Sequence, residues 1–205
     1  MATLALERYT PKTWNLSGLH GISDDTLAVH FGLYEGYVKN VNLLNEQLAE
    51  VAGEGHRAGN DPRFAELRRR LGFEFNGMRL HEYYFGNLAK GGGGTPPTDL
   101  RDALAAAFGD VETWKKDFVA TAEMRGVGWA VAAQDPWTGK MSNYWITLHE
   151  DGFPAGLSPI VVMDMWEHAF IRDYKPAEKA KYVEAFFANV DWAAVAARLR
   201  PPSPR

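Results

Sequence analysis

The segment KGGGGTPPTDL, residues 90–100, divides the chain into two parts with different hydrophobic patterns. Four consecutive glycines and two prolines interrupt both helices and strands, so the segment predicts a break between two folded parts. Before the break, apolar residues recur every three or four positions, whereas after it a stretch has the pattern of strands. We therefore expect an N-terminal helical hairpin domain over residues 1–91 and a C-terminal α/β domain over residues 92–205.

The first part has the pattern of two long helices. Ser23, followed by Asp24 and Asp25, is typical of a helix N-cap with acidic residues in the first turn. The stripe that follows consists of Leu27, His30, Tyr34, Tyr37, Val41, Leu44 and Leu48. After the glycine-rich stretch AGEGHRAGNDP, a second stripe consists of Phe64, Leu67, Leu71, Met78, His81, Phe85 and Leu88. Each arm of the expected hairpin thus carries one histidine on its inward face.

The second part mixes short helices with strands. The segments GWAVAAQ and KMSNYWITL, separated by the turn DPWTG, predict a β-hairpin, and the apolar run PIVVMDM predicts a third, more buried strand. Helices are expected over residues 98–107, 111–124 and about 176–199, with the last residues, PPSPR, frayed. The order of elements indicates an α+β fold.

Composition excludes several classes of function. The chain has no cysteine, so any metal must be bound by nitrogen and oxygen atoms. A net charge of -4 with scattered basic residues argues against a nucleic-acid partner. The N-terminal residues lack a cationic start followed by a long apolar core, and no apolar stretch is long enough to span a bilayer. We expect a cytoplasmic protein without a membrane partner.

A carboxylate and an imidazole lie four residues apart in Asp164-Met-Trp-Glu-His168, at the end of the apolar run. A buried carboxylate is costly unless a cation or hydrogen bonds compensate it. If His30 and His81 converge on the same point, three imidazoles and one carboxylate suit a first-row metal and leave one position for solvent or substrate. Taken alone, this set also permits a hydrolytic zinc site.

The motif DMWEHAFIRDY resembles the D-x-W-E-H-A-Y-Y-x-x-Y signature of iron and manganese superoxide dismutases. The likeness continues, in the same order, through ISDDTLAVHFGLYEGYVKNVNLLNE, FNGMRLHEYYFGNLAKGGGG, GVGWAV and NVDWAAVAARL. It implies a long N-terminal α-hairpin packed on a C-terminal α/β domain with a three-stranded antiparallel sheet. It also implies one iron or manganese ion per subunit, bound by His30, His81, Asp164 and His168 and alternating between the 3+ and 2+ states as superoxide becomes dioxygen and hydrogen peroxide.

The resemblance further implies a hydrogen-bond donor to the solvent on the metal, which most members supply from a glutamine. Here the helical position of that glutamine is Gly77 and the sheet position is His149. A histidine in this place matches a smaller subgroup whose members are often loaded with iron or accept both metals, so we favour iron. We expect Gly77 to leave room for the imidazole of His149, and Gln134 to lie far from the metal because it precedes the hairpin turn.

Tyr37, before Val38, resembles the gateway tyrosine that lines the substrate channel of the family and relays protons. This chain has one residue fewer than most members between the first ligand and that tyrosine, so Tyr34 competes for the role. Trp129 and Trp166 resemble aromatic residues of the pocket.

Two residues bear on assembly. The tyrosine that usually follows the last ligand by three positions is Ile171 here, whereas Glu167 is retained and is implied to bond His168 of the partner subunit. We therefore expect a homodimer or homotetramer. A non-catalytic metal-binding relative that has lost the substrate channel is the alternative, and a mononuclear non-haem oxygenase is a weaker one because it needs more open metal positions.

Overall fold

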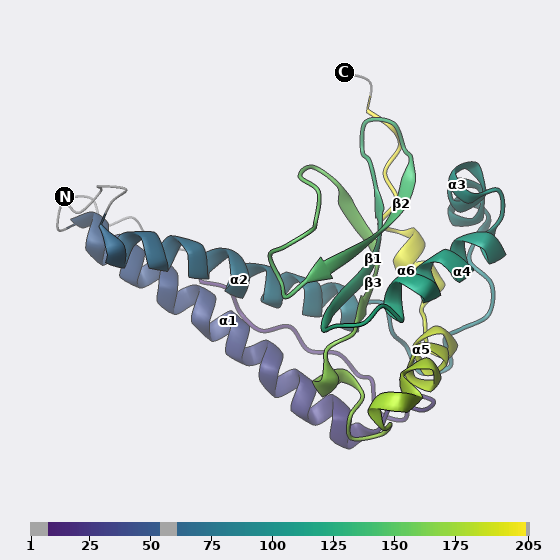
Figure 1. Ribbon diagram of the computed structural model, residues 1–205, viewed down its shortest axis with the longest axis horizontal. Coiled ribbons are helices and arrows are strands. Elements are labelled where there is room, and N and C mark those ends of the chain that lie inside the picture. Colours follow the sequence, from purple (N-terminus) through teal and green to yellow (C-terminus); the bar gives the residue numbers. More distant parts are fainter. Residues whose placement is uncertain (1–7, 54–60, 204–205) are drawn as a thin grey trace.

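The computed structural model describes residues 8–53 and 61–203. Its elements follow the order expected from the sequence, with two long helices first, two shorter helices next, then three strands and a helical C-terminal part (Figure 1). This arrangement confirms the α+β fold with a helical hairpin and a three-stranded antiparallel sheet. The division into domains at residues 91 and 92 stays a prediction.

The helical hairpin consists of α1 (Asp24–Gly53) and α2 (Pro62–Phe85), which pack against each other. Ser23 caps α1 as expected, because its Oγ accepts a hydrogen bond from the backbone N–H of Thr26 at 3.1 Å. Asp61 caps α2 in the same way, accepting from the N–H of Arg63 at 2.8 Å. The histidines of both inward stripes, His30 and His81, are fully buried.

The sheet has the order β2-β1-β3 and is antiparallel throughout. Its central strand β1 (Gly128–Gln134) is buried along its whole length, between β2 (Met141–Thr147) and β3 (Ser158–Asp164). The helix α2 packs against β3, whereas α4 (Val111–Ala122) packs against β1 and β2 after α3 (Thr98–Phe108). In Figure 1 the sheet accordingly lies between the α1–α2 hairpin and the helices on the right. The end of β3 is thereby brought to the hairpin.

The C-terminal part differs from the single helix that the sequence predicts. It contains the 3-10 turns η1 (Glu167–Ala169) and η2 (Pro176–Glu178), then α5 (Lys179–Ala188) and α6 (Trp192–Ala196). The helix breaks after Ala188 because Val190 pairs with Leu88 in a β-bridge and Asp191 caps α6 through the N–H of Ala194. The tail is not frayed up to Ser203, whose N–H donates to the carbonyl of Pro136 at 2.9 Å.

Among the described residues, no helix combines the length and the apolar character needed to cross a membrane.

Candidate metal centre

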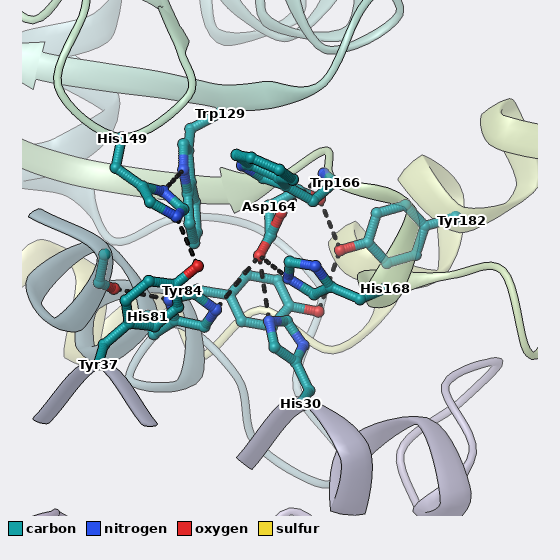
Figure 2. A network of polar contacts seen from close by, with 11 residues as sticks. His30, Tyr37, His81, Tyr84, Trp129, His149, Asp164, Trp166, His168 and Tyr182 are labelled. Atoms are coloured by element: carbon teal, nitrogen blue, oxygen red, sulfur yellow. Dashed lines mark hydrogen bonds and ion pairs between the residues drawn. The ribbon is translucent and has the colours of Figure 1, made fainter. Parts of the chain in front are cut away.

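Four residues from different elements meet between the hairpin and the sheet. His30 lies on α1, His81 on α2, Asp164 at the end of β3 and His168 in η1. Each offers one ligand atom, and these four atoms lie within 4.8 Å of one another. Figure 2 shows Asp164 at the centre, with the imidazole rings directed toward its carboxylate. The structure thus brings together the four residues that the sequence analysis selects.

Asp164 is held in place from several sides. Its Oδ1 accepts from the backbone N–H of Trp166 at 2.8 Å, which turns Oδ2 toward the histidines. Its backbone carbonyl accepts from the hydroxyl of Tyr182 at 2.8 Å, and Tyr84 lies 3.1 Å from that hydroxyl. The antiparallel register also places Trp129 of β1 beside Asp164. The carboxylate therefore has a fixed orientation.

His81 gives the clearest sign that this cluster is built for a cation. Its Nδ1 lies 2.6 Å from the carbonyl oxygen of Gly77, which can only accept, so Nδ1 carries the proton. Its Nε2 then presents a lone pair, is buried without a hydrogen-bond partner among the described residues, and lies 3.7 Å from Oδ2 of Asp164. A buried lone pair facing a carboxylate is unfavourable unless a cation lies between them.

The spacing of the ligand atoms fits a shared ion. Nε2 of His30 and Nε2 of His168 each lie 3.1 Å from Oδ2 of Asp164. Nitrogen and oxygen ligands at about 2.1 Å from a common ion lie roughly 3 Å apart when they subtend a right angle and about 4 Å when they are opposite. The residues present therefore fit one mononuclear metal ion.

The electrostatics of the site favour the metal-binding protonation state of three of the four residues, His30, His81 and Asp164. Burial lowers the pKa of His30 and, more strongly, that of His81. Burial would raise the pKa of Asp164, but the charge of His168 and the hydrogen bonds from His168 and His30 outweigh it and hold the pKa well below the usual range. Burial would lower the pKa of His168 as well, but the charge of the Asp164 carboxylate and its hydrogen bond raise it, so a metal bound there would displace a proton from His168.

His149 lies beside this cluster and has two partners of its own. The indole N–H of Trp129 donates to Nδ1 of His149 at 3.0 Å, and Nε2 of His149 lies 2.7 Å from the hydroxyl oxygen of Tyr37. Because Nδ1 accepts, the proton of the neutral ring is on Nε2, which donates to Tyr37. Burial lowers the pKa of His149 to about 4, which keeps the ring neutral at physiological pH. Trp166 stacks on the same ring at 5.0 Å (Figure 2).

The two candidate tyrosines have different surroundings. The hydroxyl of Tyr37 contacts His149, and its ring lies 5.1 Å from the ring of His81. The hydroxyl of Tyr34 instead accepts from the backbone N–H of Lys12 at 2.9 Å and donates to Glu82 at 3.2 Å. Of the two tyrosines, Tyr37 is therefore the one whose hydroxyl contacts His149.

Tyr37 is the side chain nearest to Gly77. A Cβ at Gly77 would lie 2.6 Å from Cδ1 and 2.7 Å from Cε1 of Tyr37. The ring of Tyr37 therefore occupies the space that a Cβ would fill, and the expected room for the imidazole of His149 stays a prediction.

Gln134 lies at the opposite end of β1 from Trp129, as expected, and its side chain bonds the backbone of Arg200. Sequence analysis missed the supporting residues Tyr84 and Tyr182, and also Asn76, whose side chain donates to the backbone carbonyl of His149. Tyr84 follows His81 by three positions and so shares its helix face, a usable signal. No pattern in the sequence indicates the contacts of Tyr182 or Asn76.

Comparison with known proteins shows which protein family the chain resembles. Residues 96–198 match the family model described as iron/manganese superoxide dismutases, C-terminal domain. The chain is 35% identical over 178 residues to a protein of Haloferax volcanii named manganese superoxide dismutase 2, covering 86% of each chain. It is 33% identical over 184 residues to the iron superoxide dismutase of Aquifex aeolicus, covering 88% of this chain and 85% of the relative. It is 34% identical over 186 residues to the iron superoxide dismutase of Cupriavidus metallidurans, covering 88% and 90%.

Proposed function

Because the chain belongs to the iron/manganese superoxide dismutase family, we propose that it converts superoxide into dioxygen and hydrogen peroxide at the cluster of His30, His81, Asp164 and His168. The observation that carries this assignment is the lone pair on Nε2 of His81, buried without a partner and directed at the carboxylate of Asp164. A cation bound between these two groups would satisfy the lone pair. The family relation indicates that this cation is iron or manganese.

A bound iron or manganese ion would supply the one-electron chemistry by alternating between its 3+ and 2+ states. We propose one ion per subunit, with iron favoured because His149 stands where the family resemblance implies a glutamine in most members. Both metals occur in the names of the relatives, which supports either choice at the level of the ligands.

Tyr37 is the residue that we propose supplies protons to the product. Two superoxide ions and two protons give one dioxygen and one hydrogen peroxide, so the site must deliver protons to a substrate that arrives without them. Nε2–H of His149 donates to the hydroxyl oxygen of Tyr37, so the tyrosine's own proton is not used in that bond. Burial raises the pKa of Tyr37 to about 12, and the hydroxyl therefore keeps its proton at neutral pH. That proton can therefore be donated to a group other than His149.

His149 is then a positioning residue for that proton donor. Trp129 fixes its tautomer through Nδ1, and Trp166 and Phe73 pack against its ring with centroids at 5.0 and 4.5 Å. The imidazole can neither rotate freely nor change tautomer without breaking the bond from Trp129. The oxygen of Tyr37 is consequently held at one place relative to His81.

We also propose that a second copy of the chain covers the face beside His168. Val29 and Leu33, one turn apart on α1, are 37% and 39% exposed, and Ile171 is 44% exposed two residues after η1. The helix α1, which carries Val29 and Leu33, contacts η1, which contains Glu167 and His168. An exposed apolar patch at the edge of a site indicates an interface. A homodimer or homotetramer that encloses His168 is consistent with this surface.

The experiment that tests the function measures superoxide decay after pulse radiolysis, with the metal-free protein and with the same protein reloaded with one equivalent of iron or manganese. We expect catalysis that depends on the metal and rises in proportion to its content. Stoichiometric binding without catalysis would favour the non-catalytic relative instead.

A further inference from the structure

The loop that carries His149 has an unusual backbone. It joins the end of β2 to Asp151, whose backbone pairs with that of Thr147 through hydrogen bonds of 2.8 and 3.3 Å. Within it, Leu148 has φ of 55°, and no other non-glycine residue in the described part of the chain has positive φ. A leucine rarely adopts this left-handed conformation, so the loop must be held there by contacts made elsewhere.

Asn76 makes such a contact from the helical hairpin. Its side-chain Nδ2 donates to the backbone carbonyl of His149 at 2.9 Å, joining α2 to the loop across 73 positions of sequence. The other polar contact at the backbone of His149, from its N–H to Oε2 of Glu150 at 3.3 Å, lies inside the loop. That contact cannot fix the distance between the loop and the hairpin.

Asn76 also precedes Gly77 on α2, the glycine that contacts both Tyr37 and His81. The next residue, Gly77, leaves room for the ring of Tyr37 and accepts from Nδ1 of His81. A single stretch of α2 therefore sets the positions of Tyr37 and His81 and, through Asn76, of the loop that carries His149. The bonds of 3.0 Å from Trp129 and 2.7 Å to Tyr37 both depend on where that loop lies.

We propose that Asn76 is a positioning residue that fastens the loop of His149 to α2 and so aligns the imidazole with both Trp129 and Tyr37. The inference rests on the proposed function for its effect on turnover, but its structural part does not depend on that function. Without the bond from Asn76, the loop relaxes away from the hairpin, and the two bonds of the imidazole cannot both be kept.

The test uses Asn76→Asp, which keeps the shape of the side chain but removes its N–H donor. The matched control is Asn42→Asp, because Nδ2 of Asn42 donates to the backbone carbonyl of Tyr9 at the same distance, 2.9 Å. Neither Asn42 nor Tyr9 belongs to the proposed metal site or contacts His149. The first readout is the indole N–H resonance of Trp129 in metal-free, 15N-labelled protein, assigned with Trp129→Phe. The second is turnover per bound metal.

We expect Asn76→Asp to shift or broaden the Trp129 resonance and to lower turnover by about tenfold or more at unchanged metal content. Asn42→Asp should leave both readouts as in the parent protein. An unchanged Trp129 resonance in Asn76→Asp overturns the proposal, whatever happens to turnover, and a shifted resonance with full turnover overturns the role in catalysis. A parent protein without dismutase activity would refute the proposed function alone, since the resonance still tests the fastening.

Discussion

The ring of Tyr37 occupies the space that a side chain at position 77 would fill, so that a Cβ on Gly77 would lie 2.6 Å from Cδ1 of the tyrosine. The absence of a side chain at Gly77 on α2 thus makes room for Tyr37 of α1. The position of the Tyr37 hydroxyl, 2.7 Å from Nε2 of His149, depends on this close packing.

The first prediction follows from this approach. Gly77→Ala should lower the free energy of unfolding by about 1–3 kcal/mol, because the added methyl forces the tyrosine ring to move. Urea unfolding of the metal-free protein measures it. Gly72→Ala is the control on the same helix, since an added Cβ there has no neighbour within 4 Å. It should raise the stability by about 1 kcal/mol through better helix propensity. Equal effects of the two substitutions would contradict the packing described here.

The second prediction separates the two tyrosines. Tyr37→Phe should lower turnover, because it removes the proposed proton donor and leaves Nε2–H of His149 without its acceptor. Tyr34→Phe should instead lower the thermal midpoint while turnover per metal is largely kept, since it deletes the bonds to Lys12 and Glu82. The reverse pattern would assign the proton transfer to Tyr34.

The third prediction concerns His149. His149→Ala should still bind one metal, because the four ligands remain, but turnover should fall by about 10- to 100-fold. His149→Gln should recover part of the loss, since an amide can also accept from Trp129 and donate to Tyr37. Metal analysis and pulse radiolysis measure both effects. Unchanged activity and an unchanged metal spectrum in His149→Ala would show that the residue plays no part in catalysis.

These predictions show where sequence reasoning succeeds and where it ends. The inward positions of His30 and His81 follow from helical periodicity, and Asp164 and His168 are close in sequence, so local patterns suffice to select all four. The approach of Tyr37 to Gly77 and the bond from Asn76 to His149 depend on how α1, α2 and the sheet pack together. Local patterns do not contain that information. The break at Asn189–Asp191 was missed for the same reason, because it follows from the bridge between Val190 and Leu88.

The fourth prediction tests assembly. Leu33→Glu should convert the proposed dimer into monomers at micromolar concentration, because it introduces a charge at an exposed apolar position of the proposed interface. Leu43→Glu is the control, since Leu43 is similarly exposed at 45% on the same helix but lies ten residues farther along it. Sedimentation velocity distinguishes the two. A parent protein that is a fully active monomer would refute the interface.

The fifth prediction concerns the metal. After removal of metal and separate reconstitution, the iron-loaded protein should be at least as active per bound ion as the manganese-loaded protein. Activity with manganese alone would contradict the preference inferred from His149.

The central claim is that His30, His81, Asp164 and His168 hold the metal at which superoxide is consumed. Metal stoichiometry and superoxide decay, measured together on the parent protein and on the alanine variant of each residue, test it most directly. We predict one ion per chain and catalysis in the parent, and loss of metal-dependent catalysis in all four variants. Full activity with unchanged metal content in any one variant would exclude that residue as a ligand, and the same result in all four would place the reaction elsewhere.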